Sequence, residues 1–147
     1  MKKITILITA FFLGIHSYGQ SKILNPFTDT EIMGCSCFIL ERNKYFEGNK
    51  YLGVMDFAGE WQDRKLEIKL GTQKLQLRID NTNAKSNHFG LKKYFEVYKD
   101  DIYKIEIRID YDKTKSVGEE TDLYNIALTI KYNGKTERII TKGYCGC

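Results

Sequence analysis

From residue 35 to the end of the chain, apolar and polar residues alternate with a period of two. Successive side chains of a strand point to opposite faces, so this alternation is typical of strands that bury one face in a core. The clearest run spans residues 103–111, where tyrosine and isoleucine occupy the odd positions and charged residues the even ones. A second run of the same kind spans residues 124–132. Both segments are predicted to be strands.

Two turn signals predict hairpins. Asn133 and Gly134 follow the second run at once, and both residues tolerate the positive φ angles of a type I′ turn. This arrangement predicts a hairpin over residues 123–142. Gly71 separates two shorter apolar runs, and the same reasoning predicts a hairpin over residues 66–79.

Three further segments complete the expected strands, and one turn of helix is expected before them. Residues 37–42 and 51–57 are predicted to be strands. Residues 91–99 carry both a helical spacing and an alternating pattern, and their aromatic and β-branched content favours a strand over a helix. A short helical turn is expected over residues 25–31, where a proline follows an asparagine that can cap it.

About eight strands with short connections predict an all-β fold, an antiparallel meander that closes into a small barrel or folds over as a sandwich. Closure is favoured because it removes exposed strand edges that would otherwise aggregate. No repeat, low-complexity tract or linker divides residues 20–147. A chain of this length buries about two thirds of its surface around a single core. We therefore predict a single β-rich domain.

The first 19 residues have the three parts of a secretory signal peptide. Two lysines precede an apolar run over residues 4–15, and Ser17 and Gly19 place small residues at the −3 and −1 positions of a cleavage site. The apolar run is shorter than the roughly 20 residues that span a bilayer. We predict that residues 1–19 form a Sec-type signal peptide and are cleaved.

Export would place the mature protein in the periplasm or outside the cell, and no later apolar stretch is long enough to span a membrane. Cleavage leaves 128 of the 147 residues and lowers the formal charge from +4 to +2, because two lysines are lost. This charge is too small to predict nucleic-acid binding. The 29% charged and 13% aromatic content excludes a disordered chain. We expect a monomer whose partner is a protein or a cell-envelope component.

Four cysteines form two Cys-x-Cys pairs at the two ends of the strand-rich region, Cys35 with Cys37 and Cys145 with Cys147. In extended backbone, the two sulfurs of each pair point to one face. If the first strand lies antiparallel to the last, Cys35 meets Cys147 and Cys37 meets Cys145. An even number of cysteines in an exported domain predicts disulfides, although four cysteines permit three pairings. The favoured pairing joins the N- and C-terminal segments by two disulfides.

The same thiolates support a second hypothesis, in which the protein binds a metal or exchanges disulfides. All four cysteines could hold zinc, and sulfur ligands also suit copper(I). Structural zinc motifs commonly separate their cysteines by two to four residues, unlike these pairs. Cys145 and Cys147 could exchange disulfides with Lys142 lowering a thiol pKa, but redox motifs usually have two intervening residues. Disulfides without a cofactor are the primary prediction, and zinc or copper binding is the alternative.

No catalytic residues are predicted, and candidate binding residues fall in the connections between strands. His88 is the only histidine after the signal peptide, and it lies in the polar run 80–90, which is typical of a loop. No nucleophile motif accompanies it. This loop and a second one expected over residues 112–121 are predicted to carry the binding surface, with Asn83, Asn87 and His88 as candidate contacts.

Aromatic residues offer a further candidate surface for a sugar or a peptide. Its members would be Trp61, Tyr45, Tyr51, Tyr94 and Tyr98. The sequence as a whole predicts a non-enzymatic, exported β-domain that binds a protein or an envelope component through its loops. A thiolate metal-binding or redox protein is the second hypothesis. A hydrolase is the third, and the single loop histidine argues against it.

Overall fold

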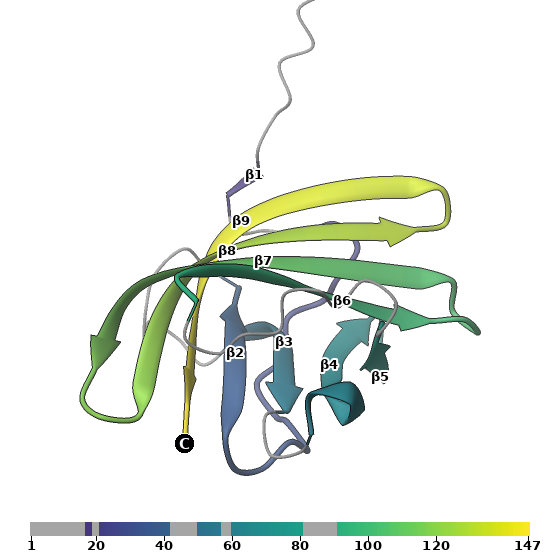
Figure 1. Cartoon of the computed structure of the whole chain (residues 1–147). Coiled ribbons are helices and arrows are strands. Elements are labelled where there is room, and N and C mark those ends of the chain that lie inside the picture. The colour runs from purple at the N-terminus through teal and green to yellow at the C-terminus, as the bar shows by residue number, and fades with distance from the viewer. Residues whose placement is uncertain (1–16, 19–20, 42–49, 57–59, 81–90) are drawn as a thin grey trace, which may run out of the picture.

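The computed structural model describes residues 17–18, 21–41, 50–56, 60–80 and 91–147, and these residues are mainly in strands (Figure 1). In chain order the strands are β1 (Ser17–Tyr18), β2 (Ser36–Leu40), β3 (Tyr51–Asp56), β4 (Lys65–Leu70), β5 (Gln73–Ile79), β6 (Lys93–Asp100), β7 (Ile105–Val117), β8 (Thr121–Tyr132) and β9 (Lys135–Gly146). Within these ranges the one helical element is the 3-10 turn η1 (Trp61–Asp63). Nowhere in them is a helix long and apolar enough to cross a membrane.

Strands β2 to β9 form a closed antiparallel barrel in which neighbours along the chain are neighbours in the sheet. β9 pairs with β8 along its whole length and with β2 through residues 143–146, and this second pairing closes the ring. The predicted antiparallel meander is therefore confirmed, and it closes as a barrel. In Figure 1 the long strands β7, β8 and β9 arch over the shorter strands β2 to β5.

The barrel interior is filled by the apolar face that the alternating sequence predicts. On β7 the isoleucines at positions 105, 107 and 109 are at most 2% exposed. Their neighbours on the other strands, among them Leu66, Leu77, Leu128, Ile130 and Ile139, are equally buried in one continuous cluster. The intervening charged residues point outward, as the pleat of a strand requires.

Glycine is required at two kinds of position in this barrel. In the β8–β9 turn, Asn133 and Gly134 have φ angles of 49° and 71°, which confirms the predicted hairpin. Gly143 lies where β9 pairs with both β8 and β2. A Cβ atom at Gly143 would come within 2.6 Å of the carbonyl oxygen of Phe38. The barrel can therefore close at this point only around a residue without a side chain.

Residues 21–34 contain no helix and pair with the barrel through isolated bridges at Leu24 and Phe27, so the helical turn expected over residues 25–31 is wrong. Asn25 does not cap a helix, because its side-chain oxygen accepts a hydrogen bond from the Gly71 amide at 2.8 Å. Phe27 and Tyr51 exchange two backbone hydrogen bonds. Partners on distant strands thus satisfy the groups that a helical turn would have used, and the Phe27 side chain is buried.

The expected loop over residues 112–121 is also wrong, since β7 and β8 continue through most of it. The composition of this segment is polar, like that of a loop, because this end of the hairpin is exposed over most of its length. Neither face of the two strands is buried there, so apolar residues do not alternate with polar ones. Polar pairs hold the two strands together there, with Asp122 accepting from Ser116 and Lys113 at 2.7 Å each. The strand favoured over residues 91–99 is confirmed as β6.

The two residues of β1 pair in parallel with Ile139 and Ile140 of β9. They belong to the predicted signal peptide. Cleavage after residue 19 would therefore remove β1 and leave the eight-stranded barrel, in which no other strand depends on β1.

Candidate functional site

Two disulfides join the first barrel strand to the last, with the predicted pairing. Cys35 is bonded to Cys147 and Cys37 to Cys145, across sequence separations of 112 and 108 residues. The register of β2 against β9 places Cys37 directly opposite Cys145. The side-by-side cysteines of each Cys-x-Cys pair thus become two neighbouring cross-links.

The two bridges differ in their surroundings. The inner bridge is part of the core, with Cys37 fully buried and Cys145 4% exposed, whereas Cys147 of the outer bridge is exposed. All four sulfurs are used in these bonds. Zinc or copper binding would need the reduced thiolates, and redox exchange would need a disulfide to open by thiolate attack. Both stay predictions. In the described ranges no three His, Cys, Asp or Glu side chains are arranged to hold a metal ion.

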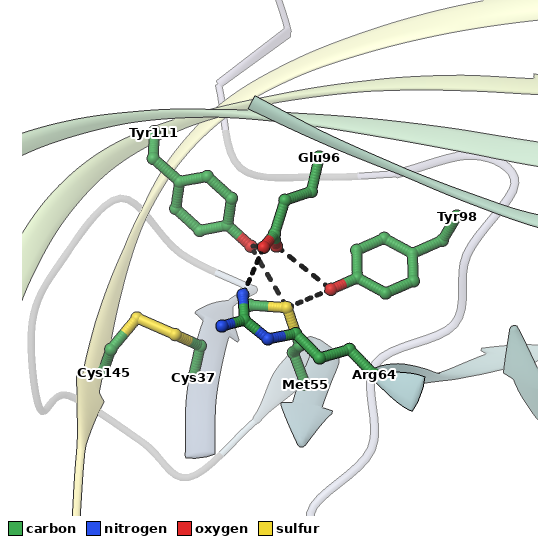
Figure 2. Close-up of polar contacts among 7 residues, drawn as sticks. All are labelled: Cys37, Met55, Arg64, Glu96, Tyr98, Tyr111 and Cys145. Carbon is green, nitrogen blue, oxygen red and sulfur yellow. Dashed lines mark hydrogen bonds and ion pairs between the residues drawn. A yellow bond between two sulfur atoms is a disulfide. The ribbon is translucent and has the colours of Figure 1, made fainter. Parts of the chain in front are cut away.

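A buried polar network lies inside the barrel, and no pattern in the sequence indicates it (Figure 2). The Arg64 guanidinium, just before β4, lies 2.5 Å from one carboxylate oxygen of Glu96 on β6. The other oxygen accepts hydrogen bonds from the hydroxyl groups of Tyr98 at 3.0 Å and Tyr111 at 3.3 Å. Both tyrosine hydroxyls also contact the Met55 sulfur.

Burial dominates the electrostatics of this network. It raises the pKa of Glu96 above its ordinary value, while Arg64 and the two tyrosine hydroxyls act in the opposite direction. Burial, with the Glu96 charge, also raises the pKa values of Tyr98 and Tyr111 well above normal. Both Glu96 oxygens already have donors in the protein. The arrangement is therefore suited to fixing the core, and it leaves no carboxylate oxygen for a substrate.

The outer face of β6 to β9 carries apolar and charged residues in ordered rows. Across the four strands, one row is Phe95, Asp110, Ala127 and Ile140, and the next is Val97, Arg108, Thr129 and Arg138. The small side chains on β8 lie between longer ones on β7 and β9. They leave an open groove with a volume of about 730 Å³ along β8.

Charged pairs shape the β7 side of this groove. The Arg108 guanidinium contacts both oxygens of Asp110, at 2.8 Å and 3.2 Å, and lies 3.9 Å from the centre of the Phe95 ring. The hydrogen bonds with Asp110 raise the pKa of Arg108. Lys93 forms a longer ion pair with Asp112 at 3.4 Å. On the β9 side Arg138 is exposed. The groove thus combines an apolar floor with charged rims.

The structure brings few of the predicted binding residues to one place. Trp61 opens η1, while Asn83, Asn87, His88 and Tyr45 lie outside the described residues, so their binding role stays a prediction. Tyr94 and Tyr98 point into the core, where Tyr94 stacks on Tyr111 with ring centres 4.5 Å apart. Tyr51 packs against Phe38 on the opposite side of the barrel. The described tyrosines therefore form no shared surface with one another.

The groove residues were not identified from the sequence because they come from four strands. The one local feature of the sequence that could indicate the groove is the pair Ala127 and Thr129. Their short side chains occupy outward positions on β8, beside charged residues on the adjacent strands. No protein-family description matches this chain, and neither a curated protein nor a solved structure is significantly similar to it. Function must therefore be inferred from the chemistry of the site.

The two disulfides are expected to stabilise the barrel redundantly, because they close nearly the same loop. Removing only the outer bridge with Cys35→Ala and Cys147→Ala should lower the free energy of unfolding by about 1 kcal/mol. Removing all four cysteines should lower it by about 4 to 5 kcal/mol, the loop-closure value for a single bridge of this span. Urea unfolding measures both. An outer-bridge variant as unstable as the four-alanine variant would contradict the redundancy.

We expect the loss of one partner of the Arg64–Glu96 ion pair to lower the stability of the protein more than the loss of both partners. Glu96→Met alone should lower the free energy of unfolding by about 3 to 5 kcal/mol, because it leaves the Arg64 charge buried without its carboxylate. The double variant Arg64→Met/Glu96→Met should lose much less, since no charge remains in the core. Chemical denaturation of the three proteins tests this. The interpretation fails if the double variant is at least as unstable as Glu96→Met.

Proposed function

We propose that the protein is exported through a Sec-type signal peptide over residues 1–19 and works in the periplasm or outside the cell. The signal pattern of the sequence supports export, and the two disulfides are consistent with an oxidising compartment. The mature domain begins at Gln20 and acts as a monomer.

In that compartment the domain binds a protein or a cell-envelope component without catalysing a reaction, and the groove along β8 is the binding site. The observation that carries this proposal is the groove itself. Its volume of about 730 Å³ lies within the roughly 300 to 1,000 Å³ of known ligand sites. Phe95 and Ile140 supply apolar contact area, and Arg108 and Arg138 supply hydrogen-bond donors.

The walls of the groove are held rigidly, which favours binding. β7 and β8 pair through twelve residues of each strand, and β8 and β9 do the same. The disulfides fix β9 to β2, so the strands that carry the rims cannot separate without breaking the barrel closure. A pre-formed site loses less conformational entropy when its ligand binds.

The side chains that line the groove favour binding over catalysis. Its carboxylates, Asp110 and Asp112, are each paired with a cation. Their side chains are 34% and 40% exposed, so neither has the apolar surroundings that keep a general acid protonated. Among the described residues that line the groove there is no cysteine, histidine or serine to serve as a nucleophile or its base.

Export is tested by the mass of the protein recovered from the medium or the periplasm of an expressing cell. We expect a chain that starts at Gln20 and lacks four hydrogens, as two disulfides require. Gly19→Arg should slow processing, because a large charged residue replaces the small one at the cleavage site. An exported protein that still begins at Met1 would contradict cleavage.

Binding at the groove is tested by nuclear magnetic resonance of the isotope-labelled mature protein. The probes are an acidic peptide, neutral glycan oligomers and lipid vesicles. We expect at least one probe to shift the backbone amides of Arg108, Ala127 and Arg138. Ala127→Phe fills the groove floor and should abolish these shifts, whereas Lys115→Phe, at the far end of the β7–β8 hairpin, should not. Shifts confined to residues 81–90, or none, would contradict the proposal.

A further inference from the structure

The charges on the outer face of β6 to β9 are unevenly matched. Each carboxylate there has a cationic partner: Asp112 pairs with Lys93, Asp110 with Arg108, and Glu106 with both Lys131 and Lys99. Arg138 also points to this face and adds a further cation on β9. A net positive field therefore remains on the β9 side of the groove.

Arg138 stands out among these cations. It is exposed, and none of the described carboxylates lies within 4.0 Å of its guanidinium group. Thr129 on β8 pairs with Arg108 on β7 and with Arg138 on β9. The two arginines are therefore two strand spacings, or roughly 10 Å, apart. Both thus face the same stretch of groove floor, but of the two only Arg108 is paired with a described carboxylate.

The contacts of Arg108 on the β7 side of the groove indicate which type of ligand group would bind Arg138 on the β9 side. On the β7 side a carboxylate sits against the Arg108 guanidinium, which also covers the ring of Phe95. The planar guanidinium group matches the geometry of a carboxylate and can bind both of its oxygens. Arg138 can therefore bind a carboxylate of a ligand in this way. Beside it, Ile140 and Ala127 provide apolar surface. A ligand that fits must carry carboxylates and apolar groups together.

We propose that the ligand of the groove is an acidic peptide segment of a partner protein, in which acidic and apolar residues lie two positions apart and therefore share one face of the extended chain. This inference rests on the proposed function and names its partner class. A carboxylate of the extended segment binds Arg138, and an apolar side chain lies over Ala127 between Ile140 and Phe95. A uniformly charged polymer could use the arginines but would leave this apolar floor uncovered.

The test uses the mature, oxidised protein and a fluorescein-labelled peptide of eight residues, in which glutamate and leucine alternate at the odd positions and serine occupies the even ones, so that both types share one face. Fluorescence anisotropy should show saturable binding that weakens as salt is added. Arg138→Glu should weaken binding by about tenfold or more, and Arg138→Gln by a smaller factor. Lys135→Glu makes the same change of charge on β9 outside the groove and should change the affinity by less than about twofold.

Three comparisons can overturn the inference. One is a peptide with glutamine in place of glutamate that binds equally well. Another is an equal loss in Arg138→Glu and Lys135→Glu, which would indicate binding to net charge alone. The third is dextran sulfate binding more tightly than the peptide and losing this affinity in Arg138→Glu. Thermal unfolding of each variant verifies that it is folded, as expected for exposed positions.

The proposed function can survive these results. If neutral glycans shift the groove amides but the acidic peptide does not, the groove is a binding site and the peptide inference is wrong. If no probe shifts these amides, the groove proposal fails as well. The two proposals are thus separated by experiments on the same protein.

Discussion

Everything else in this molecule depends on the pairing of the first barrel strand with the last. β2 and β9 are separated by about 100 residues of chain, yet only four residue pairs join them through the backbone. Two disulfides, a buried hydrogen bond from Thr141 to the Leu40 carbonyl group, and the close approach allowed by Gly143 reinforce that short seam. Closing the ring gives every barrel strand a partner strand on both sides and encloses a single core.

Closure also explains why the core tolerates charge. Inside the ring, both oxygens of the Glu96 carboxylate accept hydrogen bonds, from Arg64 and from the hydroxyl groups of Tyr98 and Tyr111, and these bonds offset part of the cost of desolvation. A buried ion pair adds little to stability compared with apolar packing, but it disfavours registers in which the two charges do not meet. We infer that the pair helps to select the register of β6 against its neighbours.

The outer face follows from the same register. Once the isoleucines of β7 point inward, the charged residues between them must form rows with the outward residues of β6, β8 and β9. Short side chains on β8 then become a groove floor, and arginines on the flanking strands become its rims. The face that stabilises the barrel and the face proposed to bind a partner are thus two consequences of one alternation.

The sequence by itself determined the strand pattern and the turn at Asn133 and Gly134, because these depend on local periodicity and turn chemistry. It favoured the meeting of Cys37 with Cys145 among three possible pairings, and the structure decided it. It did not reveal the non-helical course of residues 21–34, the length of the β7–β8 hairpin, the Arg64–Glu96 pair or the groove. Each of these depends on contacts between residues far apart in the chain. Only the tertiary structure fixes which strands are adjacent and in which register, and therefore which side chains meet.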